Sequence, residues 1–202
     1  MKETIASHLL KIKAVFLRPD DPFTWASGIK SPIYCDNRII LSYPEAREVV
    51  EKAIAETVAS EYPECEALMG TSTAGIAHAA IAATIMGLPM GYVRGSAKDH
   101  GRGNQIEGRL EKGQKVVVVE DLISTGGSCI DVVNTLREAE AEVLGIVSIF
   151  TYGLKKGLQR LEEAQVRNVS LTNFDTLIQV AAKENYITEA QIEDLLKFRN
   201  NL

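Results

Sequence analysis

The sequence predicts an α/β protein: a parallel sheet with helices on both faces and a small N-terminal hood. Strand-like and helix-like segments alternate along most of the chain, an order typical of parallel strands joined by helices. The strand-like runs are apolar throughout, which indicates that both of their faces are buried. These runs lie at residues 67–70, 89–93, 115–122 and 143–150, and helices are expected at 75–86, from Ser128, and at 154–164.

The N-terminal segment predicts a helix followed by a strand pair. Residues 3–17 carry apolar side chains at helical spacing and precede Pro19, so an amphipathic helix is expected there. Residues 23–38 read FTWASGIKSPIYCDNR, in which Ser-Gly and Ser-Pro separate short aromatic and β-branched runs. This pattern predicts two strands with a turn near Ser27 and Gly28. The hood is expected from about residues 1–40.

Two further helices have sequence signals at their starts. Ser42 is expected to cap a helix that has Pro44 in its first turn and runs to about Ser60. Near the C-terminus, Thr188 and Gln191 match the capping-box pattern, so a final helix is expected after Thr188.

Residues 94–114 have no hydrophobic period, and they contain five glycines. A structureless interval of this length inside a compact domain usually has a function. We therefore expect a mobile functional loop over about residues 94–110. It lies within one domain that spans residues 1–202, since no composition change marks a second domain.

Composition and charge exclude several classes of protein. The chain has 202 residues, with 46% hydrophobic and 24% charged residues, as in an ordinary globular protein rather than a disordered or collagen-like one. It carries 22 Lys and Arg against 27 Asp and Glu, so its formal charge is −5. A nucleic-acid binder is expected to have the opposite sign of charge. Nucleic acid is therefore not an expected partner.

The cysteines and the N-terminus predict a cytoplasmic protein. Cys35, Cys65 and Cys129 are too far apart for a CxxC metal motif, and an odd number cannot all pair within one chain. The N-terminal residues lack the uninterrupted apolar stretch of a signal peptide. Residues 74–93 carry no formal charge, but they are rich in alanine and glycine, which favours a buried helix and strand over a membrane span. No membrane partner is expected.

The strongest local signal is VVVVEDLISTGGS at residues 116–128. A buried strand ends there in two carboxylates and continues through a hydroxyl- and glycine-rich turn into a helix. Ligands collect at this edge of a parallel sheet, and residues 124–128 place backbone N–H groups and a helix N-terminus around one point, which suits a phosphate monoester. Glu120 and Asp121 would repel that phosphate, so they are expected to bind neutral hydroxyls or an accompanying cation.

Two other glycine-containing loops match nucleotide motifs only in part. Residues 70–75 have the glycine spacing of a Walker A loop, but Ile76 stands where that motif needs lysine. The loop at 71–75 can still offer amides to a second phosphoryl group, because it lies between a strand and a helix. Residues 101–106 lack the third glycine of the dinucleotide fingerprint, and no strand leads into them.

These features together resemble the type I phosphoribosyltransferase family over nearly the whole chain. VVVVEDLISTGGS is similar to the family's motif for phosphoribosyl pyrophosphate: an apolar strand, an acidic pair and a hydroxyl-glycine loop. Within the family, residues 23–38 and the segment RGSAKDHGRGN at 94–104 resemble the orotate enzymes.

The resemblance implies a pentosyl transfer reaction. Orotate would attack C1 of phosphoribosyl pyrophosphate, giving orotidine 5′-monophosphate and pyrophosphate in pyrimidine (UMP) biosynthesis. Mg²⁺ is the implied cofactor, and it would be carried by phosphoribosyl pyrophosphate with no direct protein ligand. The implied assembly is a cytoplasmic homodimer in which loop residues are shared across the interface.

By matching positions, the resemblance also implies residue roles. The catalytic residues would be Lys98, His100 and Asp121, with the first two on a glycine-flanked loop that closes over the leaving pyrophosphate and excludes water. The residues implied to bind phosphoribosyl pyrophosphate are Arg94, Lys98, His100, Glu120, Asp121, Leu122, Ile123, Ser124, Thr125, Gly126, Gly127 and Ser128.

The implied orotate site combines Ser124 with the backbone near Tyr34 and Cys35. Many orotate enzymes carry lysine or arginine at three positions where this chain does not, so those contacts with the orotate carboxylate are not carried over. Lys30 is a candidate for that contact instead. The three departing positions are Ala26, Ala74 and Tyr152.

Two rival functions remain open from the sequence alone. A purine-base phosphoribosyltransferase would keep residues 116–128 but would not need the segment at 23–38. A non-catalytic nucleotide-sensing regulator of the same fold would not need Lys98 and His100. Outside these segments, His78 is expected to be a satisfied core histidine and Cys129 a packing residue, because no histidine partner for the thiol is evident in the local sequence.

Overall fold

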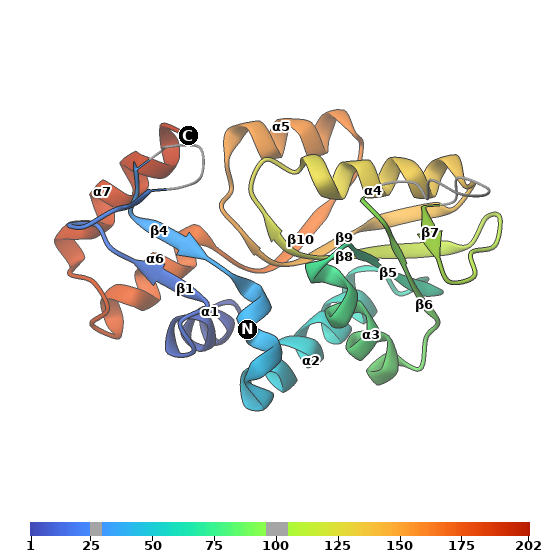
Figure 1. Ribbon diagram of the computed structural model, residues 1–202, viewed down its shortest axis with the longest axis horizontal. Coiled ribbons are helices and arrows are strands. Elements are labelled where there is room, and N and C mark those ends of the chain that lie inside the picture. The colour runs from blue at the N-terminus through green and yellow to red at the C-terminus, as the bar shows by residue number, and fades with distance from the viewer. Residues whose placement is uncertain (25–29, 96–104) are drawn as a thin grey trace.

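The computed structural model describes residues 1–24, 30–95 and 105–202, which form a six-stranded sheet covered by helices on both faces (Figure 1). The strand order is β10-β9-β8-β5-β6-β7, and all neighbouring pairs are parallel except β6 and β7. The predicted fold class is therefore confirmed, with one antiparallel edge strand added. The strands are β5 (Ala67–Thr71), β6 (Met90–Val93), β7 (Ile106–Glu107), β8 (Lys115–Ile123), β9 (Glu142–Thr151) and β10 (Asn168–Asn173).

The helices divide between the two faces of the sheet. Two of them cover one face, where Val116, Val118 and Ile146 point toward α4 and α5. The opposite face packs against α1, α2, α3 and α6, through residues such as Val117 and Val119. The helices are α1 (Lys2–Lys11), α2 (Pro44–Glu61), α3 (Ala74–Met86), α4 (Gly127–Glu138), α5 (Lys155–Glu163), α6 (Phe174–Lys183) and α7 (Glu189–Asn200).

Short antiparallel strands near the N-terminus form the hood. Strand β1 (Val15–Leu17) pairs with β4 (Ile33–Cys35), and β2 (Phe23–Thr24) pairs with β3 (Lys30–Ser31). The expected strand pair is therefore present, while its turn near Ser27 and Gly28 lies outside the described residues. A 3-10 helix, η1 (Asn37–Ser42), then leads from the hood into α2.

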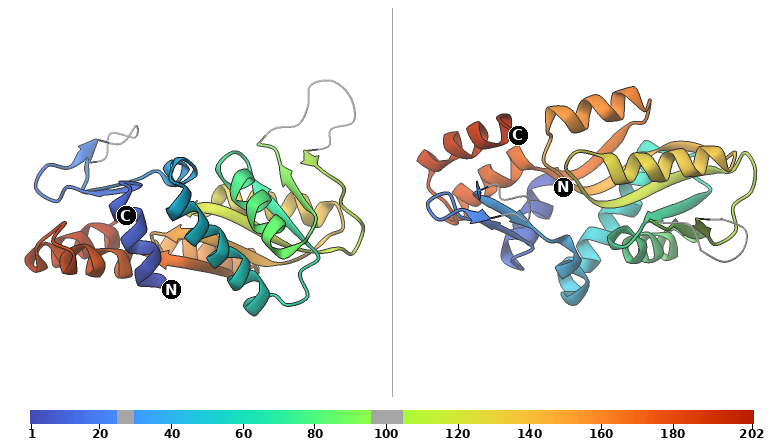
Figure 2. Two further views of the ribbon diagram at one scale, coloured as in Figure 1. Left: turned by 90° about the horizontal axis from the view of Figure 1, so that it is seen from below. Right: turned by 45° about the horizontal axis from the view of Figure 1, so that its top comes forward.

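The C-terminal helices lie on the hood side of the molecule, as the different views of Figures 1 and 2 show. Helix α6 packs against α1, and the side chain of Gln191 on α7 donates a 2.8 Å hydrogen bond to Asp20. Arg199 at the end of α7 pairs with Asp175 on α6. The expected capping box of Thr188 and Gln191 is present at the start of α7. The two ends of the chain thus support the hood together.

The prediction of one opening helix over residues 3–17 is wrong. Helix α1 ends at Lys11, and Lys13 adopts a left-handed conformation with φ of 59°. Residues 15–17 instead form β1, which pairs with β4. The helical spacing of Val15 and Phe16 misled the interpretation, because a short run of apolar residues fits either period.

Three other parts of the chain differ from the sequence prediction. Ser42 ends η1 and does not cap α2, whose N-cap is Tyr43. Strand β7 lies inside the interval that was expected to lack structure, where Ile106 is buried beside β6. Strand β10 and helix α6 were missed, since β10 alternates polar and apolar residues and does not read as a continuous apolar run.

His78 is a core residue, as predicted, but the expectation that it is satisfied is only half right: within the described residues, one of its two ring nitrogens has a hydrogen-bond partner. Its Nδ1 lies 2.6 Å from Oε1 of Glu51, and both side chains are buried between α2 and α3. In the described part of the chain, His78 Nε2 and Glu51 Oε2 have no hydrogen-bond partner. Among the helices that the structure describes, none combines the length and the apolar composition needed to cross a bilayer.

Gly75 allows α3 to begin directly against β8. A Cβ atom at this position would lie 2.3 Å from the carbonyl oxygen of Val119 and 2.5 Å from Oγ1 of Thr71. Both distances are too short for real contacts, so α3 would have to move away from the sheet. The absence of a side chain therefore sets how close the loop after β5 comes to the end of β8.

Gly75→Ala is expected to destabilise the fold by about 1–3 kcal/mol, the usual cost of overpacking a core. Thermal unfolding would measure this loss as a lower Tm. Gly95→Ala is the matched control, because a Cβ at Gly95 would meet no described atom within 4 Å. Equal melting temperatures for the two variants would contradict the packing role of Gly75.

Candidate active site

The acidic pair at the end of β8 lies at the carboxyl edge of the sheet, as predicted. Glu120 is 5% exposed, and its Oε1 accepts hydrogen bonds from Thr71 Oγ1 at 2.8 Å and from the N–H of Asp121 at 2.9 Å. Asp121 is half-buried. The two carboxylates therefore differ in exposure: that of Glu120 is held inward against β5, while that of Asp121 is partly open to solvent.

Burial and charge repulsion make Glu120 a weaker acid than an ordinary glutamate. Loss of hydration and the neighbouring Asp121 carboxylate raise the pKa of Glu120 to about 8, against an ordinary value of 4.5. The hydrogen bonds from Thr71 and from the Asp121 N–H act in the opposite direction. A carboxyl group poised in this way within a ligand-binding edge is typical of a functional site.

The loop after β8 forms an open cradle of backbone amides. Gly126 has φ of 75° and is the N-cap of α4, so no side chain occupies the capping position above the first amides of the helix. The position suits a phosphate group because the free N–H groups and the helix dipole both favour an anion. Ser124 and Ser128 are exposed beside it, and Thr125 is half-buried.

Helix α5 supports this loop from behind. Arg160 Nη1 donates a 3.3 Å hydrogen bond to the carbonyl oxygen of Thr125. Gly157 lets the helix approach closely, since a Cβ there would lie 2.5 Å from the carbonyl oxygen of Ser124. Ile123 is buried, and its carbonyl accepts the N–H of Tyr152, whereas Leu122 is half-buried. The loop is therefore anchored by its backbone carbonyl groups.

A second loop, residues 71–75 between β5 and α3, lies beside the first. Ser72 Oγ donates to the carbonyl oxygen of Val93, and the Ser72-Thr73 peptide bond is cis. Ser72 and Thr73 are exposed, while Ala74 at the start of α3 is half-buried. The expected second set of amides is thus placed next to the acidic pair, through the pairing of β5 with β8.

Arg94 follows β6 at the same edge of the sheet. Its backbone N–H donates to the carbonyl oxygen of Gln105 at 2.8 Å, and its guanidinium lies 3.7 Å from Glu107 on β7. Arg94 is therefore held where the chain enters residues 96–104. Lys98 and His100, which were expected to act on the leaving group, lie outside the described residues, as does Ala26.

The hood brings Tyr34 and Cys35 close to the acidic pair. Asn37 is fully buried, and its Nδ2 donates a 2.7 Å hydrogen bond to the main-chain carbonyl of Asp121. Its Oδ1 lies 3.5 Å from Cys35 Sγ. Burial, followed by the charges of Asp121 and Asp36, strongly raises the pKa of the Cys35 thiol. Tyr34 is exposed and packs near Phe23 in the hood, at 5.9 Å between ring centroids.

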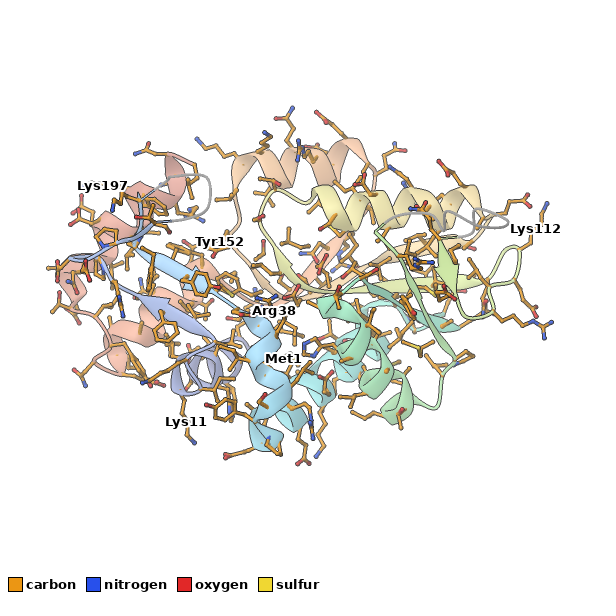
Figure 3. All side chains as sticks on the ribbon, in the orientation of Figure 1. Met1, Lys11, Arg38, Lys112, Tyr152 and Lys197 are labelled. Atoms are coloured by element: carbon orange, nitrogen blue, oxygen red, sulfur yellow. The ribbon has the colours of Figure 1, made fainter. Side chains whose placement is uncertain are left out.

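Tyr152 occupies the region between the sheet and the hood, beside β4 (Figure 3). It is buried and forms an edge contact with Phe150 at 5.3 Å. Burial raises the pKa of its hydroxyl, and the neighbouring Cys35 and Tyr34 add to this effect. The side chain at this position therefore packs the junction between hood and sheet and carries no positive charge to the site.

Thr71 and Asn37 are the residues that sequence reasoning missed. Thr71 is included in the expected phosphoryl loop, yet its hydroxyl contacts Glu120. Asn37 lies in the segment that resembles orotate enzymes, and its amide holds the backbone of Asp121. A buried polar residue next to a motif is a signal for such contacts, but its partner is set by the tertiary structure.

The comparisons with known proteins agree with this geometry. Residues 37–184 match the phosphoribosyl transferase domain. The chain is 56% identical over 201 residues to orotate phosphoribosyltransferase of Listeria monocytogenes serotype 4b, covering 100% of this chain and 96% of that protein. The chain belongs to the phosphoribosyltransferase family. Identity to orotate phosphoribosyltransferase of Bacillus cereus (strain G9842) is 58%, with the same coverage.

Solved structures show the same fold for this phosphoribosyltransferase. The crystal structure of orotate phosphoribosyltransferase from Aeropyrum pernix matches with a TM-score of 0.77 and 30% sequence identity. The match covers 91% of this chain and 99% of that chain. The similarity thus includes both the sheet and most of the surrounding helices.

The high pKa of Glu120 predicts a pH-dependent stability of this phosphoribosyltransferase. Up to about pH 8 the folded protein keeps a proton that the unfolded chain, with the ordinary value of 4.5, releases. The free energy of unfolding should therefore fall as the pH rises from about 5 to 8. Glu120→Gln removes this titration, so its Tm should exceed that of the wild type at pH 8 and approach it at pH 5. A Tm difference that does not change with pH would contradict the assignment.

Proposed function

We propose that this protein transfers the 5-phosphoribosyl group of phosphoribosyl pyrophosphate to orotate, giving orotidine 5′-monophosphate and pyrophosphate in pyrimidine biosynthesis. The observation that carries the proposal is the convergence of three features at one sheet edge: the acidic pair, the amide cradle at 124–128 and the hood strand β4. Relatives at 56% and 58% identity over the whole chain bear the name of this activity. The protein is therefore a transferase.

In this proposal, each feature binds one part of phosphoribosyl pyrophosphate. The 5′-phosphate accepts hydrogen bonds from the amides and hydroxyls of residues 124–128. Glu120 and Asp121 accept hydrogen bonds from the ribose hydroxyls, which are neutral donors and do not repel carboxylates. The pyrophosphate lies toward the loop at 71–75 and Arg94, where amides and a positive charge neutralise it.

Departure of pyrophosphate leaves a ribosyl cation-like transition state. Catalysis therefore needs positive charge on the leaving group and exclusion of water from C1. Lys98 and His100 supply that charge in this proposal, and Asp121 remains beside the ribose, where its negative charge favours the cationic sugar. Orotate approaches from the hood side, next to Ser124 and the backbone of Tyr34 and Cys35.

Mg²⁺ is the proposed cofactor, and it would enter the site with phosphoribosyl pyrophosphate. Magnesium keeps several waters and usually binds substrate phosphates, so it does not need a dedicated protein cage. Within the described ranges, no group of three or more His, Cys, Asp or Glu side chains could hold a metal ion. When bound, Mg²⁺ would neutralise developing charge on the leaving group.

A cytoplasmic homodimer is the proposed state in the cell. Cys35, Cys65 and Cys129 are all free thiols, as is usual in a reducing compartment. The resemblance of residues 94–104 to the orotate enzymes supports a loop that reaches into the site of the partner subunit. Each active site would then contain residues from both copies of the chain.

The decisive test is orotate consumption, followed by loss of orotate absorbance on addition of phosphoribosyl pyrophosphate and Mg²⁺. The proposal expects consumption that requires both additions, and no transfer to hypoxanthine or adenine in separate assays. Transfer to a purine without consumption of orotate would overturn the orotate assignment. No transfer to any base would favour a nucleotide-sensing regulator.

Lys98→Ala is expected to lower kcat by roughly 10²–10³-fold, the usual cost of removing one transition-state contact to developing charge. Orotate binding should change little, because Lys98 acts on the leaving group. Lys112→Ala is the matched control, since Lys112 is an exposed lysine at the opposite end of the molecule from Lys197 and the hood (Figure 3). An unchanged kcat for Lys98→Ala would remove this residue from the mechanism.

A mixing experiment tests the shared loop. Lys98→Ala and Asp121→Asn subunits are each expected to be inactive alone. If Lys98 acts in the partner's site, a hybrid dimer has one intact site, so random mixing restores roughly a quarter of wild-type activity. No recovery after subunit exchange, verified by hybrid dimers on native mass spectrometry, would place Lys98 in the site of its own chain.

A further inference from the structure

Thr71 lies between the two halves of the proposed site. It is the last residue of β5 and is 2% exposed. Its Oγ1 lies 2.8 Å from Oε1 of Glu120 and 3.3 Å from the carbonyl oxygen of Val119. The shorter contact marks the carboxylate as the main acceptor of the hydroxyl proton.

Strand register produces this contact. Gly70 on β5 is paired with Val119 on β8, so the next residues along the two strands, Thr71 and Glu120, are neighbours. The chain after Thr71 enters the loop at 72–75, while the chain after Glu120 enters the loop at 124–128. One hydroxyl therefore joins the strand that leads to the pyrophosphate side with the strand that leads to the ribose side.

The hydroxyl determines how the Glu120 side chain is held. Oε1 has two described donors, Thr71 Oγ1 and the N–H of Asp121. Two donors on one oxygen fix the carboxylate plane, and the Glu120 side chain also makes a side-chain hydrogen bond with Asp121 that raises its pKa. Without the Thr71 hydroxyl, the N–H of Asp121 would be the remaining described donor to Oε1. The buried carboxylate would then have fewer hydrogen bonds in place of its lost hydration, and its side chain could rotate.

We propose that Thr71 is a positioning residue for phosphoribosyl pyrophosphate: its hydroxyl holds Glu120 so that Oε2 faces the ribose hydroxyls. This inference rests on the proposed function of the acidic pair. A hydroxyl suits the task because it stabilises the carboxylate without neutralising it. The side chain thereby couples the geometry of the two substrate-binding loops.

The contact between Thr71 and Glu120 also affects the pKa of Glu120. The Thr71 hydrogen bond lowers the pKa of Glu120, against the opposing effects of burial and Asp121. Among the described residues, the titratable groups whose charges interact with Glu120 are Asp121 on β8 and Cys129 on α4. Removing the hydroxyl should therefore raise the pKa of Glu120, so that the ionised form is reached only at higher pH.

Thr71→Val tests the proposal because valine has the shape of threonine without the hydroxyl. Calorimetry of phosphoribosyl pyrophosphate with Mg²⁺ should show about tenfold weaker binding, the usual loss for a hydrogen bond to a charged group. The KM for phosphoribosyl pyrophosphate should rise by a similar factor, while the KM for orotate stays within about twofold. The pH at which binding reaches half its maximum should move upward.

Two variants separate positioning from packing. Thr71→Ser keeps the hydroxyl and should restore binding to near the wild-type value. Thr172→Val is the matched control, since Thr172 on β10 is also fully buried and its hydroxyl has no described partner. That variant should bind phosphoribosyl pyrophosphate as the wild type does. If Thr71→Val unfolds, Thr71→Ala removes the same hydroxyl with less steric demand.

A double-mutant cycle with Glu120→Ala tests whether the effect passes through Glu120. In that background, Thr71→Val should cause no further loss of binding, because the acceptor of the Thr71 hydroxyl is already gone. The proposal is wrong if the full loss persists there, if Thr71→Val binds normally, or if serine fails to rescue. Absence of orotate consumption by the wild type would instead count against the proposed function. The calorimetry measures binding of phosphoribosyl pyrophosphate without turnover, so it still tests the role of Thr71 in that case.

Discussion

The pairing of β5 with β8 is the constraint on which the site depends. Parallel pairing brings the carboxyl ends of both strands to one edge, and the Gly70 and Val119 register makes Thr71 the neighbour of Glu120. Both faces of β8 are buried, so a single-residue slip would leave its valines covered, but it would turn the Glu120 side chain to the opposite face of the sheet, away from Thr71. The register of this pair therefore decides where the acidic side chains lie. Fold and function are fixed by one set of backbone hydrogen bonds.

The burial of Glu120 at this edge of the sheet lowers the stability of the fold at neutral and higher pH. Glu120 is buried beside another carboxylate, and its raised pKa measures the resulting loss of solvation. Threonine and backbone donors offset this cost only in part. In the proposed complex, ribose hydroxyls would supply further donors, so ligand binding is expected to stabilise the fold.

The hood is held over this edge by contacts from distant parts of the chain. Asn37 links η1 to the backbone of Asp121, and Gln191 of α7 donates a 2.8 Å hydrogen bond to Asp20 in the hood. Hood and sheet therefore share a polar junction near the acidic pair. A base bound beneath β4 would meet both parts of the molecule, which couples recognition of the base to that of the ribose phosphate.

The sequence predicts most of the sheet because its central strands are long and apolar. The prediction fails where local patterns are ambiguous. Val15 and Phe16 fit a helical period as well as a strand. Strand β10 carries the polar residues Asn168 and Ser170, which hydrogen-bond with Ser148, so it does not read as an apolar strand. The acidic pair and the amide cradle are predictable since the motif is contiguous. The contacts of Thr71 and Asn37 depend on residues 49 and 84 positions away, so no local pattern reveals them.

A crystal structure of the protein with orotidine 5′-monophosphate would show where each part of the nucleotide binds. We expect the 5′-phosphate in the amide cradle of residues 124–128, the ribose hydroxyls within hydrogen-bond distance of Glu120 and Asp121, and the base beneath β4. A nucleotide bound with its phosphate elsewhere, or with its ribose turned away from the acidic pair, would rule out the proposed site.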